Sequence, residues 1–233
     1  MEGDVILITG TSKGIGQKLA YYYLSKGFMI AGCSRSDASI SHVNYKHYKA
    51  DLNDEKTLES LVRTVVNDLG RIDSLVNNAG IASMNHIMTT PVQAVQNIIN
   101  TNFIVPFILT REAAKVMQRK KSGRIINFST VAVPFNQQGE AAYASSKAAL
   151  ETFTRISSRE LAPFGITVNT VGISPYDSAL IRSVPLPKIE AMIDQQAFKR
   201  KATINDIVNV TDFFISPDSS FITGQTIYLG GVF

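Results

Sequence analysis

The sequence predicts an α/β fold with one parallel, doubly wound sheet of about seven strands and helices on both faces. Short β-rich runs alternate with longer segments of 3.6-residue periodicity from one end of the chain to the other. A glycine-rich turn follows the first run, and neither repeats nor linkers interrupt the alternation. A chain of 233 residues suits one such unit. We therefore expect a single domain over residues 1–233.

Each element follows from its residues. The expected strands are short and rich in β-branched and aromatic residues: Val5–Thr9, Met29–Ser34, Tyr45–Ala50, Ser74–Asn77, Arg124–Phe128, Thr167–Val171 and Thr226–Leu229. The expected helices are the longer periodic segments between them: Gly14–Lys26, Asp54–Leu69, Pro91–Arg119, Ala142–Ala162 and Ile204–Ile215. Residues 174–202 lack a regular pattern and contain three prolines, so we expect a substrate-binding loop or lid there.

Composition excludes several classes of protein. A hydrophobic content of 45% is enough for a full core, and 18% charged residues argues against disorder. The single cysteine, Cys33, cannot form an intramolecular disulfide and fits a reducing compartment. The N-terminus lacks signal-peptide features, and we find no apolar run near the ~20 residues that span a bilayer. We expect a cytoplasmic protein that binds neither membrane, metal nor nucleic acid.

The glycine-rich turn predicts a nucleotide site. Gly10, Gly14 and Gly16 end the first strand and begin the first helix, enclosing Ser12, Lys13 and Ile15. Glycines there permit a tight turn and close approach of the backbone to a pyrophosphate, which the helix N-terminus stabilises. The spacing Gly-x-x-x-Gly-x-Gly differs from the commoner Gly-x-Gly-x-x-Gly.

The end of the second strand indicates which nucleotide binds. An acidic residue there would bind the ribose 2′-hydroxyl of NAD, but the chain has Ser34 and Arg35. The Arg35 guanidinium and the Lys13 ammonium suit a 2′-phosphate, so we expect NADP(H). Asp51 and Leu52 end the third strand in a position to contact the adenine, although Asp51 is also suited to cap the next helix.

Tyr143 and Lys147 are candidate catalytic residues. They are spaced i and i+4, so they lie on one face of a helix. A free phenol has a pKa of about 10, and a nearby cation lowers it toward values useful for acid–base catalysis. The spacing alone fits an exposed Tyr–Lys pair equally well.

The whole chain resembles a classical short-chain dehydrogenase/reductase, in particular members of the 3-oxoacyl-[acyl-carrier-protein] reductase type. The resemblance rests on the Thr9–Gly16 turn together with Asp51-Leu52, Asn77-Asn78-Ala79-Gly80, Asn102, Tyr143-x-x-x-Lys147, Gly224-Gln225 and Gly230-Gly231. It implies a Rossmann fold in which Tyr143 is the general acid or base and Lys147 binds the nicotinamide ribose. It also implies that Asn102 interrupts its helix to hold a water, that Asn77 ties the sheet together, and that Asn78, Ala79 and Gly80 contact the cofactor.

Three features depart from the family pattern. The substrate-orienting serine is replaced by Thr130, with Ser129 as the alternative if the strand end shifts by one residue. The usual Pro-Gly after the sixth strand is replaced by Ile173-Ser174, and we expect Ile173, Tyr176 and Ser178 beside the nicotinamide. Residues 36–47 are too few for the helix that usually connects the second and third strands.

The resemblance implies an NADPH-dependent carbonyl reductase acting on a small-molecule ketone. A 3-oxoacyl thioester on a carrier protein and a cyclic or sugar ketone are both tenable, since the loops 131–140 and 174–202 that line the pocket carry no pattern. For a carrier protein, Lys121 would serve at the active-site entrance, whereas Phe164 stands where a basic residue would help. The alternative is a catalytically silent NADP(H)-binding regulatory or scaffold protein. We expect a homodimer or homotetramer, paired through the helices 91–119 and 142–162.

Overall fold

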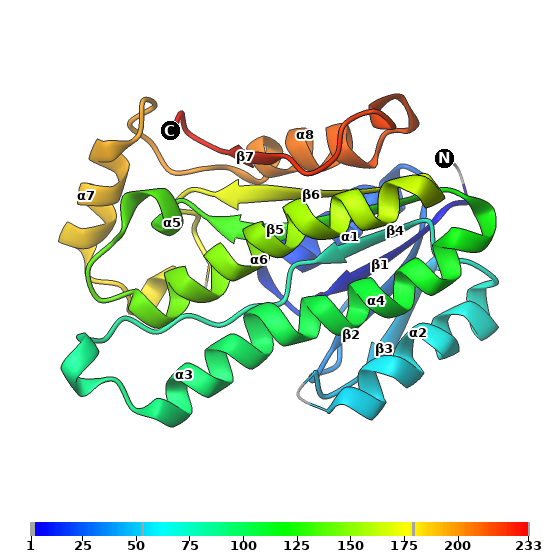
Figure 1. Ribbon diagram of the computed structural model, residues 1–233, viewed down its shortest axis with the longest axis horizontal. Coiled ribbons are helices and arrows are strands. Elements are labelled where there is room, and N and C mark those ends of the chain that lie inside the picture. The colour runs from blue at the N-terminus through cyan, green and yellow to red at the C-terminus, as the bar shows by residue number, and fades with distance from the viewer. Residues whose placement is uncertain (1–2, 53, 179, 233) are drawn as a thin grey trace.

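The computed structural model describes residues 3–52, 54–178 and 180–232. It confirms the predicted fold: seven parallel strands form one sheet in the order β3-β2-β1-β4-β5-β6-β7 (Figure 1). Their bounds are β1 Val5–Thr9, β2 Met29–Ser34, β3 Tyr45–Lys49, β4 Ser74–Asn77, β5 Gly123–Thr130, β6 Ile166–Ile173 and β7 Thr226–Tyr228. β5 and β6 extend two residues further at their carboxyl ends than predicted, so Thr130 is part of a strand.

Helices cover both faces of the sheet (Figure 1). Those of the predicted segments are α1 Gly14–Ser25, α2 Glu55–Leu69, α3 Val92–Ile99, α4 Val105–Met117, α6 Ala141–Leu161 and α8 Ile204–Ile215. α1 and α8 pack on one face, and α2, α4 and α6 lie on the other. Short 3-10 turns complete the described structure: η1 Ile87–Thr89, η3 Gln118–Lys120, η4 Ala162–Phe164, η5 Ile181–Ser183 and η6 Pro217–Ser219.

Two helices were not predicted. α5 is a single turn, Ala132–Phe135, and α7 spans Leu186–Gln195 inside the stretch expected to lack regular structure. That expectation is therefore wrong over α7. Two of the three prolines in this stretch stand where a helix tolerates proline, because Pro185 is the N-cap and Pro187 lies in the first turn. Ala179, in the same predicted loop, lies outside the described residues.

The sheet separates two hydrophobic cores. Val5 and Leu7 of β1 point into the core shared with α2 and α4, while Ile6 and Ile8 point into the core shared with α1 and α8. All four side chains are fully buried. This run is hydrophobic at every position because a parallel strand covered on both faces has no solvent side.

A chain of buried polar side chains ties the middle of the sheet to α6. Asn127 on β5 accepts a hydrogen bond from Asn77 Nδ2 (2.8 Å) and donates one to Thr154 Oγ1 (2.9 Å). Thr154 continues the chain to Thr170 Oγ1 on β6 (2.9 Å). Asn77 thus links neighbouring strands, as predicted, and α6 is fixed over the centre of the sheet.

Residues Val92–Lys120 form a continuous helical segment that is long and apolar enough to cross a membrane by length and composition. The segment is not a continuous apolar run, because Gln96, Asn97 and Asn100 lie within it. A core helix of a globular domain passes the same test, and α4 packs on α2, β4 and β5 in this fold.

We expect Asn127→Ala to lower the free energy of unfolding by about 2–4 kcal/mol. The substitution removes a partner from Asn77 Nδ2 and from Thr154, and a buried polar group left unsatisfied costs about 1–3 kcal/mol. Urea denaturation measures the change. Asn209→Ala, at an exposed position of α8, is the matched control and should change stability by less than about 0.5 kcal/mol. Equal effects of the two variants would contradict this role of Asn127.

Candidate active site

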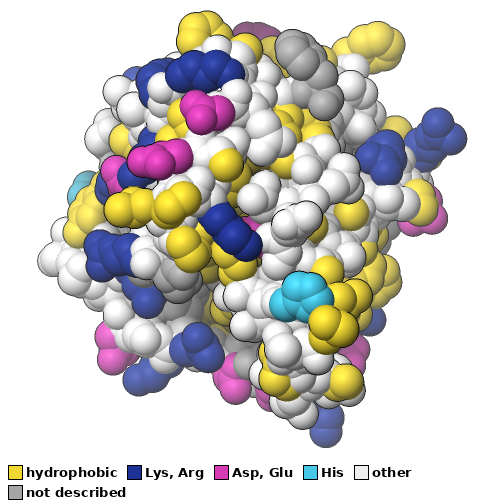
Figure 2. Space-filling model, turned by 90° about the vertical axis from the view of Figure 1, so that its left-hand side faces the viewer, with side chains coloured by type: hydrophobic (Ala, Val, Ile, Leu, Met, Phe, Trp, Pro, Cys, Tyr) yellow, Lys and Arg dark blue, Asp and Glu magenta, His cyan; other side chains and the backbone are white. Residues whose placement is uncertain are grey.

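A cavity of about 670 Å³ opens at the carboxyl ends of the strands. Figure 2 faces this end of the molecule, and α7 lies at the same end in Figure 1. Most of the predicted site residues line the cavity: Gly10, Ser12, Lys13, Gly14, Ile15, Ser34, Arg35, Leu52, Asn78, Ala79, Gly80, Thr130, Tyr143, Lys147, Ile173, Tyr176 and Ser178. The sheet therefore brings residues from across the sequence to one place, as expected for a parallel sheet.

Three predicted residues lie elsewhere. Gly16 is buried behind the glycine-rich turn, Asn102 is fully buried behind the cavity wall, and Asp51 is exposed at the surface. Asp54, rather than Asp51, caps α2 by accepting a hydrogen bond from the backbone N–H of Thr57 (3.2 Å). Gly16 and Asn102 thus support the cavity without lining it.

The glycine-rich turn fits a pyrophosphate. Gly10 and Gly14 have φ of +77° and +66°, which favours glycine, and a Cβ on Gly16 would lie 2.4 Å from the Gly10 carbonyl oxygen. α1 begins here with no side-chain cap and no acid in its first turn. Its first N–H groups and its dipole are therefore available to an anion.

Thr9 fixes the neighbouring loop to this turn. Its hydroxyl accepts hydrogen bonds from the backbone N–H groups of Asn78 (3.0 Å) and Ala79 (2.9 Å), and its carbonyl accepts one from Asn78 Nδ2 (2.7 Å). Gly80 follows, and a Cβ there would lie 3.3 Å from Asn102 Oδ1 and 3.6 Å from Lys147 Nζ. The Asn-Asn-Ala-Gly segment is therefore a rigid floor between the turn and Lys147.

The far end of the cavity is basic. The exposed side chains of Lys13 and Arg35 line it, and neither has a salt-bridge partner among the described residues. The only acid lining the cavity, within the part of the chain that the structure describes, is Glu140 at the opposite end beside Tyr143. A doubly charged phosphate is therefore compatible with this end.

Tyr143 and Thr130 meet at the inner end of the cavity. Burial raises the pKa of the Tyr143 phenol to about 12, a hydrogen bond with the Thr130 hydroxyl lowers it, and Glu140 raises it. Thr130 also accepts a hydrogen bond from the backbone N–H of Ala132 (3.2 Å). Ser129, the alternative, also lines the cavity, and its hydroxyl donates to Glu151 Oε1 (2.5 Å).

Lys147 is buried with its ammonium bonded to the sheet. Its Nζ donates to the Phe128 carbonyl oxygen (2.7 Å), and only 4% of the residue is exposed. Burial lowers the pKa of Lys147 to about 8, and Glu151 one turn further along α6 raises it. The expectation that Lys147 lowers the pKa of Tyr143 is not met here, because burial dominates the phenol and the ammonium is bonded to Phe128.

Asn102 interrupts its helix as expected. It lies in a π-helical turn, Asn100–Ile104 (η2), between α3 and α4. Its side chain exchanges two hydrogen bonds with the backbone of Ile81 (2.9 Å each) and donates to Ser146 Oγ (3.0 Å). Ser146 in turn donates to the Tyr143 carbonyl oxygen (2.6 Å). Asn102 therefore connects the floor of the cavity to the catalytic helix.

Several lining residues were not singled out from the sequence. They come mainly from the loops after strands and from α3 and α7: Ser36, Ile81, Ala82, Asn97, Thr101, Phe128, Glu140, Ser174, Pro175, Leu180, Ile181, Val184 and Met192. Glu140 is 6% exposed, and its Oε2 has no hydrogen-bond partner among the described residues. Its position three residues before Tyr143 is the one sequence signal that would have found it.

The wall on the β6 side is fixed by Tyr176. This side chain is 6% exposed, and its hydroxyl accepts a hydrogen bond from Lys18 Nζ (2.7 Å). Ser174 Oγ donates to the Leu229 carbonyl oxygen (2.5 Å), which ties the same loop to the residue after β7. The loop after β6 is therefore anchored from two sides, although its sequence departs from the family pattern.

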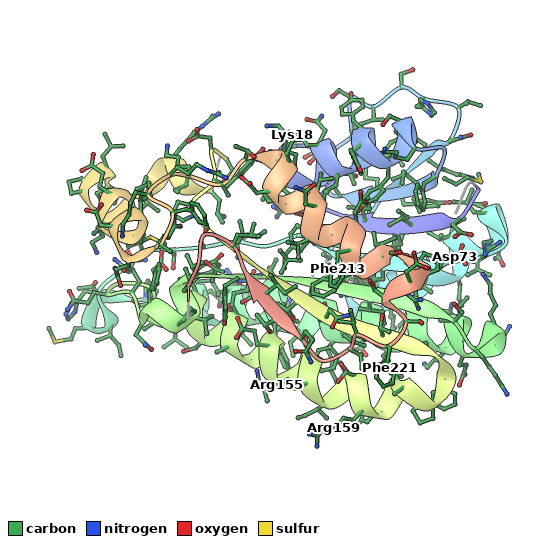
Figure 3. All side chains as sticks on the ribbon, turned by 90° about the horizontal axis from the view of Figure 1, so that it is seen from above. Lys18, Asp73, Arg155, Arg159, Phe213 and Phe221 are labelled. Atoms are coloured by element: carbon green, nitrogen blue, oxygen red, sulfur yellow. The ribbon has the colours of Figure 1, made fainter. Side chains whose placement is uncertain are left out.

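Lys121 lies at the amino end of β5 rather than at the cavity. The eight residues of β5 run from the end near Lys121 to Thr130 at the cavity and span about 26 Å at ~3.3 Å per residue. The adjacent Lys120 binds Asp73 (2.8 Å), which Figure 3 shows on the opposite side of the view from α7. The expectation that Lys121 stands at the entrance is therefore wrong for one copy of the chain.

Within the described ranges, no group of three or more His, Cys, Asp or Glu is placed to hold a metal.

Comparisons with known proteins agree with this fold and site. A family model described as Enoyl-(Acyl carrier protein) reductase matches residues 10–231. The 3-oxoacyl-[acyl-carrier-protein] reductases FabG of Vibrio harveyi and Escherichia coli are 31% and 30% identical, and each match covers 99% of this chain and 97% of the relative. The structure of Thermoplasma acidophilum aldohexose dehydrogenase has a TM-score of 0.89 at 26% identity, covering 98% of this chain and 93% of that one. The structure of 4-hydroxyisoleucine dehydrogenase complexed with NADH has a TM-score of 0.88, also at 26% identity, covering 98% and 97%.

The fold and the family match thus define an oxidoreductase. The chain belongs to the classical short-chain dehydrogenase/reductase family and resembles its 3-oxoacyl-[acyl-carrier-protein] reductases.

We expect the stability difference between the wild type and Lys147→Met to depend on pH. The pKa of Lys147 is lowered to about 8 in the folded chain from 10.5, so between these values the unfolded state binds more protons. The wild type should therefore gain on the order of 3 kcal/mol relative to Lys147→Met as the pH rises from about 7 to 10.5. Urea denaturation across this range measures it, and a constant difference would contradict the burial of a charged Lys147.

Proposed function

We propose that this protein is an NADPH-dependent carbonyl reductase that also catalyses the reverse oxidation of the alcohol. The observation that carries the proposal is that Thr130, Tyr143 and Lys147 line the inner end of a cavity whose outer end is the glycine-rich turn. A proton donor thus stands at one end of a site suited to a dinucleotide at the other.

We assign cofactor binding to the residues that the sequence predicted for it. The glycine-rich turn and the α1 N-terminus would hold the pyrophosphate, and Lys147 and Tyr143 would contact the nicotinamide ribose. When bound, the nicotinamide supplies the hydride. The protein contributes orientation and proton transfer.

Tyr143 delivers the proton in the reducing direction. Because burial raises its pKa, the phenol is protonated at neutral pH and donates to the oxygen that becomes an alcohol. The Thr130 hydroxyl would donate a hydrogen bond to the same carbonyl oxygen and so orient it toward the phenol. Lys147 supplies positive charge nearby, while Asn102 fixes α6 through Ser146.

The distribution of charge supports NADP(H) over NAD(H). Lys13 and Arg35 line the outer end of the cavity, and Ser34 occupies the place where an acid would repel a 2′-phosphate. The neighbour solved with NADH shows that related folds accept the other nucleotide, so this assignment depends on Lys13 and Arg35 in this chain.

For the substrate, we favour a 3-oxoacyl thioester. Leu180, Ile181, Val184 and Met192 give the cavity an apolar wall that suits an acyl chain, and the similar FabG proteins are named for such substrates. A hydroxylated ketone is the second candidate, because the unpartnered Glu140 carboxyl suits a hydroxyl donor. Carrier-protein binding would need basic residues other than Lys121 of the same chain.

We further propose a homodimer or homotetramer in the cytoplasm. Phe107 and Ile156 are exposed by 41% and 54% on the outer sides of α4 and α6, around a hollow that Phe103 and Phe153 also line. An apolar surface of this kind supports pairing of two copies through these helices. The single buried cysteine is compatible with a reducing compartment.

We expect Tyr143→Phe to lower kcat for ketone reduction on the order of 10²–10⁴-fold, because it removes the proton donor. NADPH oxidation with acetoacetyl-coenzyme A, hydroxyacetone and cyclohexanone measures the rate and ranks the substrate classes. Tyr21→Phe, an exposed phenol on α1, is the matched control and should retain full activity. Unchanged turnover in Tyr143→Phe would exclude its assigned role. A protein that binds NADPH but oxidises it with no carbonyl would instead be the silent regulatory alternative.

We expect Arg35→Ala to lower kcat/KM for NADPH by roughly tenfold to a hundredfold and that for NADH by less than about twofold. The guanidinium is expected to bind only the 2′-phosphate, and a hydrogen bond to a charged group contributes about 1.5–3 kcal/mol. Lys13→Ala should act in the same direction. Arg63→Ala, exposed on α2, is the control. A wild type that prefers NADH would overturn the cofactor assignment.

A further inference from the structure

A chain of hydrogen-bonded side chains runs behind the basic end of the cavity. Thr11 Oγ1 lies 3.0 Å from Tyr45 Oη, and Tyr45 Oη lies 2.8 Å from His47 Nδ1. His47 Nε2 lies 3.0 Å from the Ser36 carbonyl oxygen and 3.4 Å from Ser34 Oγ. The chain therefore links the glycine-rich turn, through two side chains of β3, to the residues on either side of Arg35.

The donor and acceptor roles along these hydrogen bonds follow from the last acceptor, the Ser36 carbonyl oxygen. A carbonyl oxygen only accepts, so His47 Nε2 carries the proton that it donates to Ser36. In the neutral ring, Nδ1 then accepts from the Tyr45 hydroxyl, and the Tyr45 oxygen accepts from Thr11. Each donor and acceptor between Thr11 and Ser36 is used, so the four groups hold one another in a single arrangement.

The backbone leaves room for this chain at Gly32. A Cβ on Gly32 would lie 2.2 Å from Tyr45 Oη and 2.6 Å from Thr11 Oγ1. Any other residue at this position of β2 would therefore displace the Tyr45 hydroxyl from Thr11. The contact depends on a glycine outside the phosphate-binding turn.

The connection between β2 and β3 needs such a support. Residues 35–44 form no helix, and Arg35 and Ser36 are exposed. Ser34 Oγ donates to the Ser36 carbonyl oxygen (2.6 Å), and His47 binds the same oxygen. The turn that carries Arg35 is thus closed by Ser34 and held against β3 by His47. The Arg35 side chain itself has no salt-bridge partner among the described residues.

We propose that His47 is a positioning residue that determines nucleotide specificity. By holding the Ser34–Ser36 turn, it keeps the Arg35 guanidinium where a ribose 2′-phosphate binds, and so makes NADP(H) the preferred nucleotide. The proposal rests on the proposed NADP(H) preference. His47 touches the turn and not the phosphate, which separates its role from that of Arg35.

The test measures binding of two nucleotide fragments by isothermal titration calorimetry, with no catalysis involved. Adenosine 2′,5′-bisphosphate carries the 2′-phosphate, and adenosine 5′-monophosphate lacks it. His47→Ala should weaken binding of the bisphosphate about tenfold, corresponding to the net contribution of a lost hydrogen bond, and that of the monophosphate less than about twofold. His47→Gln retains an N–H donor and should recover most of the affinity.

Matched variants separate positioning from general stability. His42→Ala removes an exposed histidine of the same connection, whose ring accepts from the Asn44 backbone N–H (3.1 Å), and should leave both affinities unchanged. Tyr45→Phe removes the donor to His47 Nδ1 and should weaken the bisphosphate selectively, by about two- to fivefold. This variant decides the question if His47→Ala does not fold.

The outcomes distinguish this proposal from the proposed function. The role of His47 would be overturned if His47→Ala or Tyr45→Phe weakened binding of both fragments equally, or of neither. In that case, a wild-type preference for the bisphosphate would still uphold the NADP(H) assignment. A wild type that binds both fragments equally would overturn the NADP(H) assignment itself, and with it the positioning role.

Discussion

Burial of the Lys147 ammonium is the constraint on which the site depends. A charge removed from water is costly unless it is paired and hydrogen-bonded. The fold meets this cost with the Phe128 carbonyl oxygen at 2.7 Å and with the Glu151 carboxylate one turn further along α6. The contact with Phe128 fixes α6 over the carboxyl end of β5. The position of Tyr143, one turn before Lys147, is thus set by where the cation is tolerated.

Glu151 extends this constraint to the rest of the sheet. Its two carboxylate oxygens accept hydrogen bonds from Ser129 Oγ (2.5 Å) and from Tyr228 Oη (2.7 Å), so β5, α6 and β7 meet at one buried carboxylate. The Ser129 hydroxyl is engaged in this contact, and Thr130 lines the cavity next to it. A threonine in place of a serine at the site thereby keeps its hydroxyl beside Tyr143.

The two halves of the cavity differ in what lines them, backbone in one and side chains in the other. The nucleotide half is mainly backbone: positive-φ glycines, an uncapped helix N-terminus and a loop tied down by Thr9. The substrate half is mainly side chains from α7 and from the loops after β5 and β6. Backbone geometry constrains sequence strongly, whereas a wall of side chains admits many sequences. The reaction type is therefore much better determined than the substrate.

The sequence alone determined the strands, most helices and the nucleotide half of the site. Those features depend on local rules: hydrophobic period, glycine at positive φ, and the i,i+4 spacing of Tyr143 and Lys147. Local rules failed at α7, because a proline that breaks a helix interior is accepted in its first turn. The Lys121 expectation came from the family resemblance, and it failed because Lys121 precedes β5 whereas the cavity lies at the carboxyl end of that strand.

Only the tertiary structure paired Ser129 with Glu151, set the direction of the Tyr143 pKa and placed His47 behind Arg35. Each of these depends on residues distant in the sequence: Glu151 for Ser129, the burial of the phenol for Tyr143, and Thr11 and Ser36 for the His47 chain. The physical reason is that hydrogen bonding and desolvation act through space. A sequence specifies which groups can interact, and packing specifies which of them are removed from water together.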